Sequence, residues 1–299
     1  LSCLELEGDK GICIDKKNNL ITSIKLISSQ LLPVCTSLIG FILLLRQGWI
    51  FIRKKNNPWP KVISPPLSLI DMVLLIAGGF VVMGEVALPA FIVPISDLFF
   101  KEVASPLRES LRVLIGYCSM TIGPLIILRY QLKGIITSRI DGGWLQWRFK
   151  PIGESVFKSI NGWLMIMPLV LFIGWIMTQV VGDQGGSNPL LDLVLSSNEL
   201  IPLLLLLITT VILAPIFEEL IFRGILLPVL AEKMGKIGGV FISALIFALA
   251  HLSVGELPPL FVLGIGLGVM RLSSGRLFPC ALMHSLWNGV TFASLLLVA

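Results

Sequence analysis

Long apolar runs separated by short polar connections constrain this chain more than any other feature of its sequence. The 299 residues are 55% hydrophobic and only 14% charged, whereas soluble domains carry about 25% charged residues. An apolar run of about 18 residues is long enough to cross the hydrocarbon core of a bilayer as a helix. The pattern predicts an all-α fold, a polytopic membrane helical bundle, and excludes a soluble globular domain.

We expect about eight transmembrane helices and three regions along the chain. The regions are a polar N-terminal tail over 1–25, N-terminal transmembrane helices with basic loops over 26–199, and a C-terminal core over 200–299. The expected spans are 26–45, 69–92, 110–128, 162–181, 200–226, 237–253, 257–272 and 277–298.

The charges of the connecting loops predict an orientation. The loops after the first, third, fifth and seventh spans hold fifteen Lys and Arg, against three in the other internal loops. Basic loops are retained on the cytoplasmic side, so both termini are expected on the opposite side. The net charge of +5 is accounted for by these loops, and no nucleic-acid partner is expected. We expect the plasma membrane of a bacterium, or a thylakoid membrane.

Three charged side chains interrupt one apolar run, APIFEELIFRGIL over residues 214–226. A charge at the centre of a membrane helix costs about 2.5–3.5 kcal/mol. Glu219 and Arg223 are four residues apart, so they share a helix face and can pair. Glu218 is rotated from Glu219 by about 100° and points elsewhere. A charge pair that only orients two helices is the simplest alternative to a functional site.

The two histidines of the chain, His251 and His284, also fall inside expected spans. Phe247 lies one turn before His251, and Asn288 lies one turn after His284. Polar groups are costly in lipid unless they face the bundle interior or water. We therefore expect three spans to converge on one polar cavity, placed between the bilayer centre and the cytoplasmic face.

These residue types suit water activation. A carboxylate and an imidazole together polarise a water molecule, the carboxylate taking the proton. A second imidazole and an amide can stabilise the oxyanion of a tetrahedral intermediate, which completes the requirements for peptide hydrolysis. The same acid and imidazoles, Glu218, His251 and His284, would also be the ligand set of a catalytic zinc ion. The chain has no H-E-x-x-H motif, so such ligands would come from separate helices.

Three short motifs resemble a known family. "EELIFR" matches E-E-x-x-x-R, "FALAH" matches F-x-x-x-H, and "HSLWN" matches H-x-x-x-N. In these motifs, over about residues 200–298, the chain resembles the CAAX-protease and bacteriocin-processing family of intramembrane endopeptidases, which includes the Ras-converting CAAX prenyl endopeptidase. Residues 1–199 show no motif of this family.

The resemblance implies a role for each motif residue. Glu218 would activate water with the help of His251, and an oxyanion site would be formed by His284 and Asn288. The supporting residues of the motifs would be Glu219, Arg223 and Phe247. Members of the family are described both as metal-dependent and as glutamate-dependent. We expect a glutamate-type protease with no cofactor, zinc being the alternative, and with membrane lipid and a peptide or protein substrate as partners.

Two other classes of function fit the same composition. A proton-coupled transporter also carries ionisable residues inside its spans, and Asp71 and Glu85 lie in the span 69–92. A non-catalytic membrane scaffold, chaperone or immunity protein of the same fold is the second alternative. The sequence identifies neither the substrate nor the cleavage position.

Overall fold

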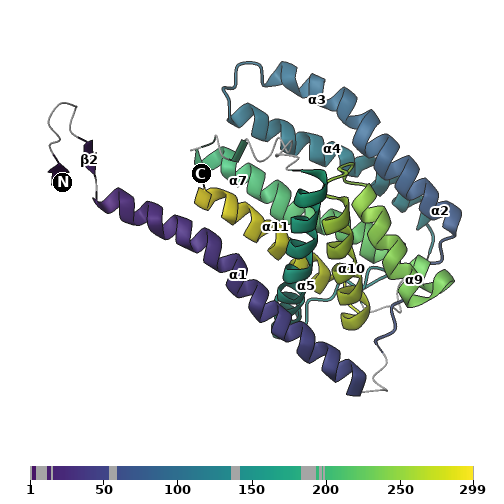
Figure 1. Cartoon of the computed structure of the whole chain (residues 1–299). Helices are drawn as coiled ribbons and strands as arrows, with labels where there is room; N and C mark the ends of the chain where they lie inside the picture. Colours follow the sequence, from purple (N-terminus) through teal and green to yellow (C-terminus); the bar gives the residue numbers. More distant parts are fainter. Residues whose placement is uncertain are drawn as a thin grey trace.

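Long apolar helices make up almost all of the computed structural model, which describes residues 2–4, 12–14, 16–53, 59–135, 142–182, 193–194, 197 and 199–298. A short antiparallel hairpin of β1 (Ser2–Leu4) and β2 (Ile12–Ile14) precedes them (Figure 1). Seven helical stretches of the described residues are long and apolar enough to cross a membrane. The predicted class, a polytopic helical bundle, is confirmed.

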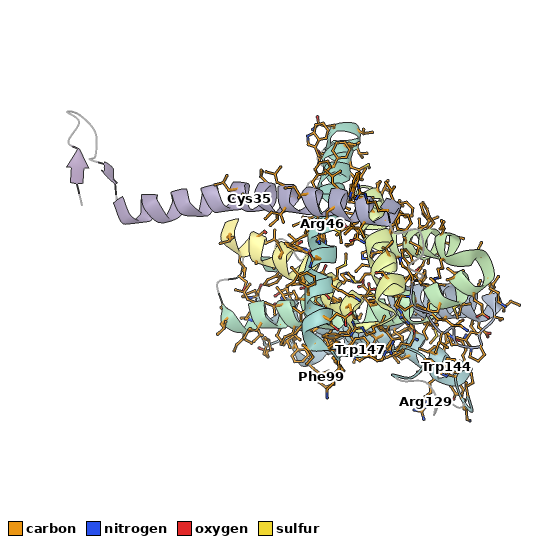
Figure 2. The ribbon with its side chains drawn as sticks, turned by 90° about the horizontal axis from the view of Figure 1, so that it is seen from below. Cys35, Arg46, Phe99, Arg129, Trp144 and Trp147 are labelled. Carbon is orange, nitrogen blue, oxygen red and sulfur yellow. The ribbon has the colours of Figure 1, made fainter. Side chains whose placement is uncertain are left out.

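The helical elements follow one another in a simple order, and several join end to end. They are α1 (Lys16–Arg53), α2 (Leu69–Val73), the π-helical η1 (Leu74–Ala87), α3 (Leu88–Phe99), α4 (Leu107–Gln131), α5 (Ile152–Val181), α7 (Leu200–Leu207), the π-helical η2 (Ile208–Leu213), α8 (Ala214–Glu219), the π-helical η3 (Leu220–Leu226), α9 (Leu227–Leu249), α10 (Leu257–Ser274) and α11 (Phe278–Val298). Helix α1 begins at Lys16, inside the region expected to be a polar tail. It lies along one side of the bundle (Figure 2).

The longest stretch, Leu200–Leu249, turns back on itself at Gly235. This glycine has φ 78° and ψ 163°, which is not a helical conformation. A Cβ built on Gly239 would lie 2.7 Å from the backbone nitrogen of Ala231, whereas residues eight apart in a continuous helix are separated by about 12 Å. Because the chain reverses here, the seven described stretches cross the bundle eight times, as the sequence predicted.

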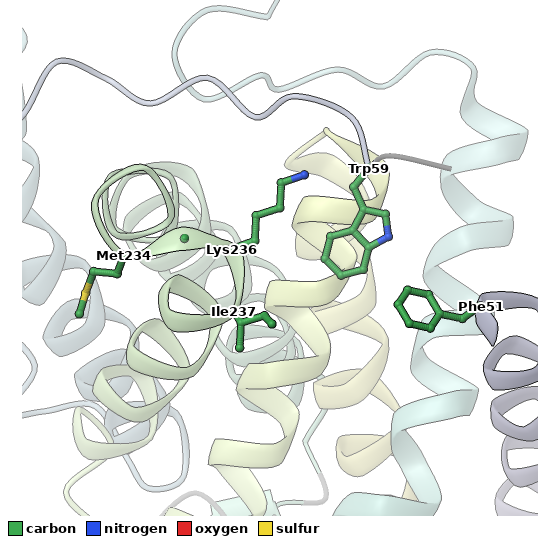
Figure 3. Close-up of a pocket in the computed structure, with 6 residues that line it drawn as sticks. Phe51, Trp59, Met234, Lys236 and Ile237 are labelled. Atoms are coloured by element: carbon green, nitrogen blue, oxygen red, sulfur yellow. The ribbon is translucent and has the colours of Figure 1, made fainter. Parts of the chain in front are cut away.

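Connections rich in Lys and Arg meet at one end of the bundle, which we call the basic face. It comprises residues 59–68, 142–151, 275–277 and the turn at Gly235. The amide of Leu277 donates to the carbonyl of Gln146 at 3.2 Å. At the turn, the Lys236 ammonium lies 5.9 Å from the centre of the Trp59 ring (Figure 3). The opposite end, the distal face, comprises residues 100–106, 182, 193–194, 197, 199, 251–256 and the C-terminal end of α11.

Two arginines expected in basic loops are instead buried. Arg271 has no exposed surface and donates to Oε1 of Gln146 at 2.7 Å and to the carbonyl of Arg223 at 3.1 Å. Arg276 is 6% exposed, pairs with Glu154 of α5 at 3.1 Å and donates to the carbonyl of Lys150 at 2.9 Å. Both side chains therefore tie the connection 142–151 to the helices above it. The sequence around a basic residue at a helix end does not show whether its side chain is solvated or buried, so both arginines were counted with the loops.

Aromatic packing fixes the helix that carries the two adjacent glutamates. Phe217 of α8 stacks on Phe80 of η1 with ring centres 6.0 Å apart. Phe222 of η3 meets Phe247 of α9 edge-on at 5.4 Å. These contacts hold α8 and η3 between the N-terminal helices and α9, so the charged side chains between them have fixed directions.

We predict that Gly235→Ala lowers the melting temperature of the purified protein in detergent. The observed φ and ψ lie in a region that is essentially restricted to glycine, and a side chain there costs about 1–3 kcal/mol. The matched control is Gly153→Ala on α5, where an added Cβ meets nothing within 4 Å. The Gly153→Ala variant should have the same melting temperature as the unchanged protein, or a higher one. Equal effects of the two substitutions would contradict the non-helical turn at Gly235.

Candidate active site

The structure brings the predicted site residues together from α8, η3, α9 and its C-terminal end, and α11. The two glutamates end α8, and their arginine partner follows on η3. One histidine lies just beyond the end of α9, and the other lies on α11 with the asparagine one turn later. The residues so assembled are Glu218, Glu219, Arg223, Phe247, His251, His284 and Asn288.

Glu219 and Arg223 form a buried ion pair. Neither side chain has exposed surface, and Oε1 of Glu219 lies 2.8 Å from Nη1 of Arg223. The guanidinium also donates to the carbonyl of Gly264 at 3.2 Å and lies 4.3 Å from the centre of the Phe247 ring. Buried charges are tolerated only when they are paired and hydrogen-bonded. Oε1 of Glu219 is therefore occupied by its partners, whereas its Oε2 is buried without a hydrogen-bond partner among the described residues.

His284 connects this pair to the second carboxylate. Its Nδ1 lies 3.0 Å from Oε1 of Glu219. An ionised carboxylate only accepts hydrogen bonds, so Nδ1 carries the proton and donates. The other ring nitrogen, Nε2, lies 3.9 Å from Oε2 of Glu218.

His251 is oriented in the same way by a backbone carbonyl. Its Nδ1 lies 2.8 Å from the carbonyl oxygen of Phe247, which can only accept, so Nδ1 is the donor. The ring rests against the Phe247 ring, with centres 4.7 Å apart. In the neutral histidine, Nε2 then has a free lone pair, and it lies 4.0 Å from Oε2 of Glu218.

Oε2 of Glu218 lies between the Nε2 atoms of the two imidazoles. It is buried and has no hydrogen-bond partner among the described residues. Gaps of 3.9 and 4.0 Å to the two Nε2 atoms exceed the roughly 2.7–3.2 Å of a direct hydrogen bond. A water molecule placed about 2.8 Å from each of two atoms spans a gap of this size. The geometry therefore suits one shared water.

The same three side chains fit a tetrahedral zinc ion poorly as they stand. Zinc bonds of about 2.0–2.2 Å place the ligand atoms of a tetrahedral site about 3.4 Å apart, which is less than both observed gaps. No group of three His, Cys, Asp or Glu in the described part of the chain has metal-binding spacing. We therefore derive no step that uses zinc.

A cavity of about 500 Å³ contains the site. Asn288 lines it and donates through Nδ2 to the carbonyl of Thr210 at 2.8 Å, which leaves its second N–H for another acceptor. Glu218 and Asn288 lie near the middle of their membrane passes, but the cavity reaches Glu256 in a distal-face connection. The expected depth of the site, between the bilayer centre and the cytoplasmic face, stays a prediction.

Two further residues near Glu218 come from helices that carry no motif. The Tyr117 hydroxyl of α4 donates to the carbonyl of Ala214 at 3.3 Å, and Tyr117 lines the same cavity as Glu218. Glu85 of η1 interacts electrostatically with Glu218 and His251. Tyr117 is one of two tyrosines in the chain. Its position within an apolar span was the one feature of the sequence that could have identified it as a residue of the site.

Asp71, considered with Glu85 as part of a proton path, has a structural role instead. Its carboxylate accepts from the backbone amide of Ser68 at 2.7 Å, and the Ser68 hydroxyl accepts from the Asp71 amide, which closes a capping box at the start of α2. Asp71 is therefore a helix cap near the basic face. Its position does not support a path for protons that runs from Asp71 to Glu85.

Comparison with known proteins supports the resemblance seen in the motifs. Residues 200–290 match the family model described as type II CAAX prenyl endopeptidase, Rce1-like. No curated protein and no solved structure matches the chain. The matched segment contains all three motifs, whereas α1 to α5 lie outside it.

We predict that Arg223→Met lowers the free energy of unfolding by about 3–5 kcal/mol, because it leaves the Glu219 carboxylate buried without its counter-charge. The double variant Glu219→Gln/Arg223→Met should be more stable than the single one, since both charges are gone. Unfolding by SDS in mixed micelles measures both values. A double variant less stable than Arg223→Met would show that the two charges are not coupled.

Proposed function

Since residues 200–290 carry a type II CAAX prenyl endopeptidase-like domain, we propose that this protein is a glutamate-type intramembrane endopeptidase that uses water activated by Glu218 and His251. The family match supports a protease. The observation that carries the proposal is the buried Oε2 of Glu218, which has an imidazole nitrogen on either side at 3.9 and 4.0 Å.

In the first step, water adds to the peptide carbonyl. Glu218 accepts one proton of the water, and the lone pair on Nε2 of His251 accepts a hydrogen bond from the other. The water oxygen then forms a bond to the carbonyl carbon, and the C=O π pair moves onto the carbonyl oxygen. The hydrogen bond from Nδ1 of His251 to Phe247 keeps the lone pair aimed at the water.

The oxyanion so formed lies within reach of Asn288 and His284 in this proposal. Asn288 contributes the N–H that is not bound to Thr210. His284 already donates from Nδ1 to Glu219, so it donates from Nε2 only as the imidazolium ion. The adjacent Glu219 carboxylate provides the negative charge that such a cation requires, and donors preorganised in this way lower the barrier to acyl transfer.

In the second step, the intermediate collapses. The proton held by Glu218 passes to the amide nitrogen, the C–N bond breaks, and the products are an amine and a carboxylic acid. The carboxylate is then ready for another water molecule. Tyr117 lines the same cavity, and we infer that its hydroxyl, by donating to the carbonyl of Ala214, fixes the helical turn that leads to Glu218.

The seven apolar stretches make this an integral, multi-pass membrane protein. Within that frame we propose a peptide segment of another membrane-associated protein as the substrate and the plasma membrane of a bacterium, or a thylakoid membrane, as the location. Lining residues such as Leu206, Leu263 and Phe292 are apolar, which favours a substrate segment that is itself partly apolar.

We predict that Glu218→Gln abolishes cleavage while the protein still folds, since the amide cannot accept the proton of water. General-base catalysis contributes about 10²–10⁴-fold, so the rate should fall by at least 100-fold. Protein termini in membranes from cells that express the active chain or this variant can be compared by mass spectrometry. Glu256→Gln, in the same cavity, is the matched control.

Termini that require the active chain and survive Glu256→Gln would identify the substrate. Identical termini with the active chain and with Glu218→Gln would contradict a protease. A substrate-like partner that binds both forms equally and is never cut would indicate the non-catalytic scaffold instead.

We also predict that cleavage by the purified protein persists after treatment with a zinc chelator, because the proposed water needs only the carboxylate and the imidazoles. The rate is measured before and after treatment, with a zinc protease as the positive control for the chelator. Loss of activity that added zinc restores would contradict the proposal and would require the three side chains to move closer.

A further inference from the structure

A second cleft lies at the basic face, between the end of α1 and the turn at Gly235 (Figure 3). Its volume is about 560 Å³, within the range of about 300–1,000 Å³ that is typical of ligand sites. None of the described residues that line it also lines the cavity of the catalytic residues. Apart from the glycine and one lysine, its lining side chains are apolar or aromatic: Phe51, Trp59, Met234, Lys236 and Ile237.

The apolar walls of this cleft are open to its surroundings. The exposed fractions of Phe51, Met234 and Ile237 are 71%, 51% and 78%, and a Cβ built on Gly235 would meet nothing within 4 Å. Phe51 lies near the end of the membrane-crossing stretch Pro33–Arg53, and the turn at Gly235 joins two passes of another stretch. The walls therefore lie at the ends of spans, where the headgroups of the bilayer meet its hydrocarbon core.

Trp59 gives the cleft a fixed aromatic wall. Its side chain packs against the buried cluster of Leu227, Val240 and Leu272, so packing restrains the ring. The Lys236 ammonium lies 5.9 Å from the centre of that ring, within the roughly 6 Å of a cation–π contact. Tryptophan is enriched at the level of the headgroups. The ring and the lysine thus place a positive charge beside an apolar cleft, at the depth of lipid phosphates.

The surroundings of the cleft add further positive charge. Within two residues of its lining residues, the sequence places three more basic residues, Arg53, Lys61 and Lys233, and one acidic residue, Glu232. All four are exposed. Together with Lys236, four positive charges are set against one negative charge. Basic pockets between membrane helices, near the membrane surface, bind lipids with anionic headgroups.

We infer that this cleft binds an anionic phospholipid, with an acyl chain against Phe51, Met234 and Ile237 and the phosphate beside Lys236. Exposed apolar surface rimmed by polar groups marks an interaction site. A free phosphate would leave the apolar walls uncovered, and a zwitterionic lipid would gain little from the excess of positive charge. The lipid contacts both α1 and the turn of α9, so it joins a helix outside the family match to the matched part of the chain.

Lipid binding to the purified protein in detergent tests this inference. The probes are phosphatidylglycerol and phosphatidylcholine with the same acyl chains, and native mass spectrometry measures the dissociation constant of each. Lys236→Gln removes the charge in the cleft. Lys133→Gln, in the exposed connection after α4, removes the same charge outside the cleft and is the matched control. Phe51→Ala removes part of the apolar wall at an exposed position.

The unchanged protein and Lys133→Gln should bind phosphatidylglycerol about tenfold more tightly than phosphatidylcholine or better, since several basic residues contribute. Lys236→Gln should weaken phosphatidylglycerol binding about fivefold, the effect of one lysine near a membrane surface, and should leave phosphatidylcholine binding unchanged. Phe51→Ala should weaken the binding of both lipids.

Equal binding of the two lipids by the unchanged protein, or equal effects of the two lysine variants, would overturn the inference. Self-association that Phe51→Ala abolishes and added lipid leaves unchanged would also overturn it, because the occupant of the cleft would then be a second copy of this chain. Lipid binding needs no catalysis, so a protein without protease activity gives the same readout. This inference and the proposed function therefore fail separately.

Discussion

One buried ion pair, Glu219 with Arg223, holds the site together. Arg223 reaches the carbonyl of Gly264 on α10 and covers the face of Phe247 on α9, while Glu219 orients His284 on α11. Three helices, α9, α10 and α11, thus contact one pair of charges on a single helical turn. Because an unpaired charge at this depth is so costly, the pair is either formed with all these contacts or the helices separate. Glu218, one residue away, acquires its position from that arrangement.

The sequence predicted most of this arrangement because a polar group inside a membrane is costly unless it has a polar partner or contacts water. Two histidines, an asparagine and three charges on three spans could avoid that cost by facing one cavity or by pairing. Glu218, His251, His284 and Asn288 line the cavity, and Glu219 pairs with Arg223. The four-residue spacing of Glu219 and Arg223 predicted their pairing, and the apolar runs predicted eight crossings, of which the fifth and sixth are joined by the turn at Gly235. The roles of Glu218 and His251 in catalysis stay predictions.

Other features depend on how helices pack, which no local pattern contains. Tyr117 reaches Ala214 and Phe217 of α8, and Phe80 of η1 stacks on Phe217, because α4 and η1 pack beside α8. Arg271 is buried because the connection 142–151 folds under α10. The extent of the cavity depends on how α4, α7, α10 and α11 pack around it, which the depth of single residues along their spans does not show.

The most direct measurement is an experimental structure of the protein in lipid at a resolution that shows ordered water. Our account places one water about 2.7–3.2 Å from Oε2 of Glu218 and from Nε2 of His251 and His284. A direct hydrogen bond between Glu218 and either histidine, or a density peak about 2.0–2.2 Å from all three atoms as for a metal ion, would contradict it.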